Sequence, residues 1–220
     1  MLFRSHLKGV FKEKTGRPDF LMNITKHRDA AKEEIIAAMM DAETEMCNNG
    51  IVAVGDISNN DISFAIKANQ KLHYHTFIEL IAFNPFNAFN AMAAGEKLLS
   101  AARDFAIHAS LAPHATYSVS PELVKQINKH CYENGKPTSI HMLESNDENE
   151  WYIQGTGLYR KLYRELKVDI NHFQPTGKTA LETLLPHFNS KVKTLLVHNT
   201  IATAWDADCV PAAINNGDNT

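Results

Sequence analysis

Short apolar runs alternate with segments of helical periodicity along most of this sequence, and this alternation restricts the fold more than any other feature. Strands that are separated by helices pair in parallel, because each helix carries the chain back to the edge where the next strand begins. The sequence therefore predicts an α/β protein with a parallel sheet. The runs indicate five buried strands, at residues 51–56, 75–81, 105–112, 138–141 and 193–197.

The segments between the strands carry helix signals. Ser120 is a good N-cap residue, and Pro121 suits the first position of the helix that follows. No segment has the composition of a linker, so residues 1–200 are predicted to form one domain, followed by a loose C-terminal tail at 201–220. The other predicted helices cover residues 25–48, 61–70, 87–103 and 179–188, with one more inside 147–175.

Composition and charge argue against several classes of function. The net charge of -3, with 21% charged residues of both signs, gives no attraction to nucleic acid or to an anionic membrane. No apolar run reaches the roughly 18 residues of a membrane-spanning helix, and a signal peptide is absent from the first residues. Cys47, Cys131 and Cys209 lie far apart, which indicates a reducing compartment. We therefore expect a soluble, cytoplasmic protein.

Polar residues stand at the ends of the predicted strands, namely Asp56, Glu79, His114, His141 and His198. The carboxyl ends of parallel strands meet at one edge of a sheet, where α/β enzymes carry their catalytic groups. We expect these side chains to line one pocket. The carboxylates of Asp56 and Glu79 are expected to be supporting hydrogen-bond partners rather than catalysts.

His141 and Glu144 form the most informative pair in this set. A neutral imidazole is a metal ligand, and a carboxylate three residues later can move a proton beside the metal. His-x-x-Glu alone is common by chance, and a single strand-end histidine is more often structural, so the pair gains weight only from the other strand ends. The acidic residues at 147–150 are predicted to form a solvated turn or helix start.

Two further motifs are not expected to carry function. His73 and His75 form a His-x-His pair, but it stands at the start of its strand, away from the predicted pocket. Gly177-Lys178-Thr179 is similar to the end of a phosphate-binding loop, but the glycine required five positions earlier is His172.

Three segments in order, residues 112–120, 139–145 and 195–199, resemble the amidohydrolase superfamily. The similarity is greatest to the branch of cytosine deaminases, chlorohydrolases and aminodeoxyfutalosine deaminase-like enzymes, and it extends over residues 5–200. It implies a TIM-barrel-like (β/α)8 fold in which one divalent metal ion, zinc or iron, activates water against a non-peptide C–N bond.

The resemblance also implies a role for each strand-end residue. His141 would be a metal ligand, and His198 would contact the metal or the water that it activates. Glu144 would be the general acid and base that moves a proton from the water to the leaving group. His114 would bind the substrate.

The sequence departs from the family pattern at both ends. The family's first strand ends in a His-x-His metal pair, and Ser5-His6-Leu7-Lys8-Gly9 resembles the segment that follows this pair. The last two strands and the aspartate that completes the metal site are not recognisable after Thr200. Asp206 and Asp208 follow the preceding strand too closely to replace that aspartate. We therefore expect an incomplete barrel with open sheet edges, which favour self-association into a homo-oligomer.

Three hypotheses for function follow. The first is a metal-dependent hydrolase that deaminates a small heterocyclic amine and is inactive as this isolated chain. The alternative is a non-catalytic scaffold that binds a small molecule or a partner through its open sheet edges. A metal-free barrel enzyme that uses Glu144 and His114 as an acid/base pair is the third. The residues do not identify the substrate or distinguish zinc from iron.

Overall fold

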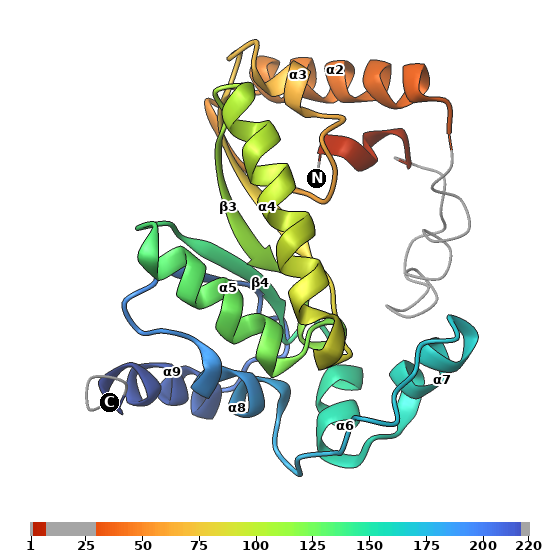
Figure 1. Ribbon diagram of the computed structural model, residues 1–220, viewed down its shortest axis with the longest axis vertical. Helices are drawn as coiled ribbons and strands as arrows, with labels where there is room; N and C mark the ends of the chain where they lie inside the picture. The colour runs from red at the N-terminus through yellow and green to blue at the C-terminus, as the bar shows by residue number, and fades with distance from the viewer. Residues whose placement is uncertain (1, 8–29, 217–220) are drawn as a thin grey trace. The chain divides into compact units, whose positions relative to one another are not determined.

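Strands and helices alternate through the part of the chain that the computed structural model describes, residues 2–7 and 30–216 (Figure 1). The strands are β1 (Ala53–Ser58), β2 (His73–Leu80), β3 (His108–Pro113), β4 (Thr138–Met142) and β5 (Thr194–His198). The α-helices are α2 (Lys32–Asn48), α3 (Phe64–Lys67), α4 (Ala88–Asp104), α5 (Pro121–Glu133), α6 (Asn146–Gln154), α7 (Gly157–Glu165), α8 (Ala180–Leu184) and α9 (Ala204–Asn216). Short 3-10 helices include η1 (Leu2–Leu7) and η3 (Thr116–Ser118).

Strand pairing confirms the predicted α/β fold with parallel strands. One sheet has the order β1-β2-β3, and β4 and β5 form a second pair. In the parallel pair of β1 and β2, Ala53 lies opposite His73, and in the parallel pair of β4 and β5, Thr138 lies opposite Thr194. The chain divides into two compact units, the first from Met1–Glu79 with Gly95–Ser110 and the second from Leu80–Ala94 with Leu111–Thr220.

Three segments differ from the sequence-based expectation. Residues 147–175 contain most of α6 and all of α7 rather than one helix. β1 does not end at Asp56 but continues to Ser58. The predicted loose tail contains α9, which begins after Thr203. The Thr203 amide and hydroxyl both donate to Asp206 Oδ2, at 2.8 and 2.7 Å, and the Asp206 amide donates back to Thr203 Oγ1. This Thr-x-x-Asp spacing is a helix-start signal that the prediction overlooked. Residues 25–29 of the predicted first helix lie outside the described residues.

The first unit has an apolar core where α2 meets β2. Met39, Ile66, Leu72 and Tyr74 are buried there, and the partly buried Ile35, Ile36, Met46 and Cys47 pack against them. The apolar face of α2 therefore packs inward, although Met40 is exposed. Helical spacing places residues three and four apart, such as Ile35, Met39 and Met46, on one face.

In the second unit, α5 precedes β4 along the chain (Figure 1). Ser120 caps the helix as predicted, because its Oγ accepts a hydrogen bond from the Leu123 amide at 3.2 Å. The buried Cys131 on α5 donates to the Leu111 carbonyl oxygen, which also accepts a 2.9 Å hydrogen bond from Thr138 Oγ1 of β4. No helix among the described residues has the length and apolarity to cross a membrane.

Cys131 is expected to resist thiol reagents in the folded protein. Burial raises the pKa of its thiol from 9.0 to about 11, and hydrogen bonds from its surroundings oppose the shift only in part. The thiolate fraction at pH 8 is then lowered about 100-fold. Because the folded state disfavours the thiolate, the thiol's contribution to stability declines as the pH rises above its ordinary pKa.

Labelling with Ellman's reagent at pH 8 measures this protection. Cys131→Ser should leave the number of thiols that react in the native protein unchanged. Cys47→Ser, the control at a half-buried position, should lower that number by one. Rapid native labelling that Cys131→Ser removes would contradict the expectation.

Candidate functional site

The parallel pairing of β4 and β5 brings two of the predicted histidines together. In the register of this pair His141 lies opposite Val197, and His198 lies opposite Met142, so the histidines are one position apart across the strands. Their ring centroids are 5.0 Å apart. His198 ends β5 with a φ of 79°, and the next residue, Asn199, has a φ of 53°. The strand end is therefore an irregular turn at the position where the imidazole is presented.

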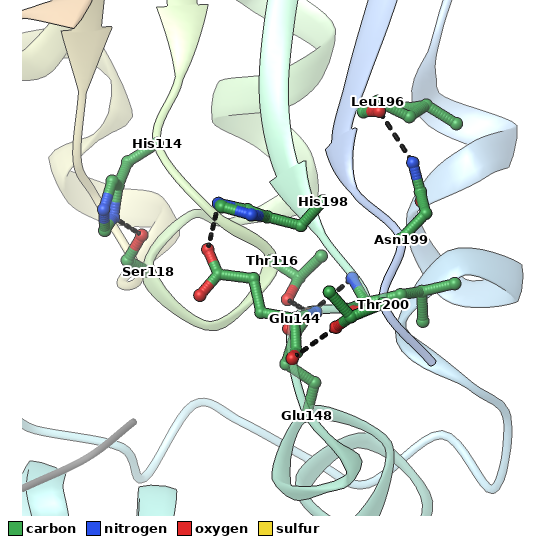
Figure 2. Close-up of polar contacts among 10 residues, drawn as sticks. His114, Thr116, Ser118, Glu144, Glu148, Leu196, His198, Asn199 and Thr200 are labelled. Carbon is green, nitrogen blue, oxygen red and sulfur yellow. Dashed lines mark hydrogen bonds and ion pairs between the residues drawn. The ribbon is translucent and has the colours of Figure 1, made fainter. Parts of the chain in front are cut away.

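Glu144 joins the two histidines from the turn after β4. Its Oε1 lies 3.5 Å from His198 Nε2, and its side chain is 3% exposed whereas that of His198 is 36% exposed (Figure 2). One potential ligand atom from each of His141, Glu144 and His198 lies within 4.8 Å of the others. Two imidazoles and one carboxylate are donors that both zinc and iron accept, so this group of residues fits a divalent metal.

His114 lies beside this cluster. Its ring centroid is 5.5 Å from that of His141, with the two rings almost perpendicular, and its carbonyl oxygen accepts a 2.9 Å hydrogen bond from the His141 amide. A 2.6 Å hydrogen bond joins His114 Nδ1 to Ser118 Oγ on η3 and sets the plane of the ring (Figure 2). The structure thus groups all four residues predicted from the resemblance, while their chemical roles stay predictions.

Glu148 is a residue of this region that the sequence analysis misjudged. The acidic segment does start α6, as expected, but Glu148 is fully buried rather than solvated. Its Oε2 accepts hydrogen bonds from Thr116 Oγ1 at 2.6 Å and from the Leu143 amide at 3.1 Å. Burial raises the pKa of Glu148, and these hydrogen bonds oppose the shift. The prediction failed because a solvated and a buried carboxylate in the first turn of a helix have the same sequence signal.

Asp56 and Glu79 belong to the first unit and have partners there. Asp56 forms a 2.8 Å ion pair with Lys67, and Glu79 Oε2 accepts a 3.4 Å hydrogen bond from Asn59. Their supporting role toward the site stays a prediction. His73 is the first residue of β2 and is exposed, and His75 is hydrogen-bonded to Ser110 at 2.9 Å.

Comparison with protein families identifies the class of this chain. The sequence model of the amidohydrolase family matches residues 5–218. The chain therefore belongs to the amidohydrolase family. The resemblance inferred from the strand-end segments is thereby confirmed.

Two curated relatives and one crystal structure define the likeness further. The chain is 26% identical over 198 residues to an adenosine deaminase of Helicobacter pylori, and the matched region covers 90% of this chain and 48% of that protein. It is 26% identical over 185 residues to an aminodeoxyfutalosine deaminase of Nitratiruptor sp., and this match covers 81% of this chain and 44% of that protein. The crystal structure of Helicobacter pylori aminofutalosine deaminase in complex with methylthio-coformycin matches with a TM-score of 0.80 at 22% identity, over 98% of this chain and 52% of that chain.

The chain thus spans about half the length of the curated relatives that it matches. Its fold is an incomplete TIM-barrel-like (β/α) structure of the amidohydrolase kind, as the resemblance implied.

Proposed function

We propose that this protein is a metal-dependent hydrolase that deaminates a small heterocyclic amine. The observation that carries the proposal is the cluster of His141, Glu144 and His198 at the ends of two neighbouring parallel strands. Membership of the amidohydrolase family supports hydrolysis. Deamination is supported by the names of the two relatives, adenosine deaminase and aminodeoxyfutalosine deaminase.

His141 and His198 are the proposed ligands of one divalent ion, Zn²⁺ or Fe²⁺. Neutral imidazole nitrogens suit both metals, and β4 and β5 place the two ring centroids 5.0 Å apart. A bound divalent ion supplies Lewis acidity, which makes water acidic enough to ionise near neutral pH.

Glu144 is the proposed proton carrier. Its carboxylate lies within reach of His198 and is almost completely shielded from solvent, so a proton that it accepts is not exchanged at once with bulk water. It would take a proton from water and return it to the leaving amine. His114, whose ring orientation is set by Ser118, is proposed to contact the substrate.

A small-molecule substrate and a cytoplasmic location belong to the same proposal. The relatives' names support the former. The three cysteines of the chain, all without disulfide bonds, support the latter.

Replacing His141 with Ala is expected to remove bound metal. The purified, untagged chain, dialysed after incubation with Zn²⁺ or Fe²⁺, should retain about one equivalent, because two imidazoles and a carboxylate converge on one point. His141→Ala should retain less than a tenth of that amount. His73→Ala is the matched control, since His73 is exposed at the start of β2, and its metal content should equal that of the wild type. Inductively coupled plasma mass spectrometry gives all three values.

Equal metal content in the wild type and His141→Ala would overturn the assignment of His141. Absence of metal from every form would favour the non-catalytic scaffold. A parallel assay of ammonia release from adenosine, with Zn²⁺ or Fe²⁺ added, examines the expectation that the isolated chain is inactive. Turnover that requires the added metal would refute that expectation and support the hydrolase.

A further inference from the structure

The turn that carries Glu144 is held on its amide side by one carboxylate. Both oxygens of Glu148 accept backbone hydrogen bonds, Oε2 from the Leu143 amide at 3.1 Å and Oε1 from the Glu144 amide at 2.5 Å. An amide N–H can only donate, so each of these contacts requires an acceptor oxygen. Glutamine at this position would place an NH₂ group against one of the two amides, and a donor would then face a donor.

The same turn is held on its carbonyl side by one hydroxyl. Thr200 Oγ1 lies 3.1 Å from the Leu143 carbonyl oxygen and 2.6 Å from the Glu144 carbonyl oxygen, and it can donate to either (Figure 2). The Ile201 amide also donates to the Leu143 carbonyl, at 3.3 Å. Because Thr200 lies two residues after His198, the last residue of β5, this contact ties the turn after β4 to the strand end that presents His198.

The backbone of the turn has an uncommon conformation. Leu143 has a φ of 51°, in the left-handed region that a branched residue rarely adopts. Its side chain is buried, so packing and the polar contacts from Glu148, Thr200 and Ile201 together keep it there. The direction of the Glu144 side chain follows from this backbone conformation.

Glu148 is itself fixed by a hydrogen bond from a second element, η3. Thr116 of η3 donates to Oε2 at 2.6 Å, and the Thr116 carbonyl in turn accepts a 2.8 Å hydrogen bond from Tyr152 Oη of α6. The carboxylate is fully buried, so water does not compete for its lone pairs. A buried acceptor with all its donors in place is a rigid support.

We propose that Glu148 and Thr200 are positioning residues that clamp the Leu143–Glu144 peptide from both sides and so aim the Glu144 carboxylate at the histidine cluster. The role of the clamp in aiming Glu144 rests on the proposed function. The hydrogen bonds that form the clamp depend neither on bound metal nor on turnover. Glu148 would thus act through Glu144 and not on the substrate.

A purely structural role for Glu148 is the competing explanation. Glu148 is the third residue of α6, where a carboxylate can also cap the helix. Loss of a cap would lower overall stability and loosen the first turn of α6. It would not selectively release the two amides that precede the helix.

Amide hydrogen exchange, followed by NMR on the full chain without added metal, separates the two explanations. In Glu148→Gln, the Leu143 and Glu144 amides should exchange about tenfold faster or more, because hydrogen bonds to a charged acceptor are lost. Amides in the middle of α6 should keep their rates. Glu150→Gln makes the same chemical change two residues away, where the carboxylate accepts from Thr156 Oγ1, and it should leave all these rates unchanged.

Thr200→Val tests the other side of the clamp with a side chain of the same shape. It should also raise exchange at Leu143 and Glu144, and it carries the test if Glu148→Gln fails to fold. Unchanged exchange at these amides in the variants that fold would overturn the clamp. So would a rise spread evenly over α6, which is the result expected of a helix cap.

Two further measurements distinguish failure of this inference from failure of the proposed function. If the chain turns over substrate, Glu148→Gln should lower kcat about 10- to 100-fold with little change in KM, since supporting groups around a site typically contribute that much. Unchanged kcat in an active chain would reject the aiming and leave the hydrolase intact. Absence of turnover and metal, with faster exchange at Leu143 and Glu144, would reject the hydrolase and leave the clamp intact.

Discussion

Lys67→Met should lower the free energy of unfolding by about 3–5 kcal/mol, a large part of the stability of an ordinary domain. The Lys67 ammonium forms a 2.8 Å ion pair with Asp56, with both side chains buried, and it also donates to Thr76 Oγ1 at 3.0 Å. Burial lowers the pKa of Lys67, and the Asp56 carboxylate opposes this shift. Methionine fills the space but leaves the carboxylate buried without its counter-charge, which is the costly state.

Urea denaturation followed by circular dichroism measures this loss. Lys129→Met is the control, because Lys129 and its partner Glu133 are exposed and 3.9 Å apart, and no measurable change is expected. The double variant Lys67→Met/Asp56→Leu should recover most of the lost stability, since an apolar pair can replace a buried ion pair. A double variant as unstable as the single one would show that packing, not the unpaired charge, causes the loss.

Trp151→Ala should also lower the free energy of unfolding by about 3–5 kcal/mol. Trp151 is fully buried in α6, and its ring stacks on Phe173 with centroids 4.3 Å apart. The ring centroid of Tyr163 lies 5.1 Å from that of Trp151. Truncation would leave a large cavity among rings whose positions are set by several helices and loops. Because α6 also carries Glu148, the same change should loosen the turn that presents Glu144.

The second tryptophan provides the control. Trp205 on α9 is 65% exposed, and Trp205→Ala should change stability by no more than about 0.5 kcal/mol. Since the chain has only these two tryptophans, the fluorescence of each variant reports the other ring. Trp151→Phe, which keeps an aromatic ring against Phe173, should lose less than Trp151→Ala. Equal losses in the free energy of unfolding for Trp151→Ala and Trp205→Ala would mean that the packing of Trp151 against Phe173 and Tyr163 does not anchor α6.

The strands, most of the helices and the four clustered site residues could be predicted because their signals are local. An apolar run that ends in His141, or a Ser-Pro pair at 120–121, is recognisable without knowledge of what packs against it. Grouping of the histidines then followed from one topological rule, that the carboxyl ends of parallel strands share an edge. The family could be predicted because three such segments occur in order.

The α/β alternation is encoded locally in the sequence, as are the histidines near the strand ends and the Glu144 that follows one of them. Which carboxylates are solvated and which are buried depends instead on the packing of the folded chain. Glu148 lies in an acidic segment that resembles a solvated helix start, yet its oxygens hold the turn of Glu144. Asp56 at a predicted strand end pairs with Lys67 from a different element. The reason is physical: burial and hydrogen-bond partners depend on contacts between residues far apart in the chain, for which a single residue's identity and spacing carry no signal.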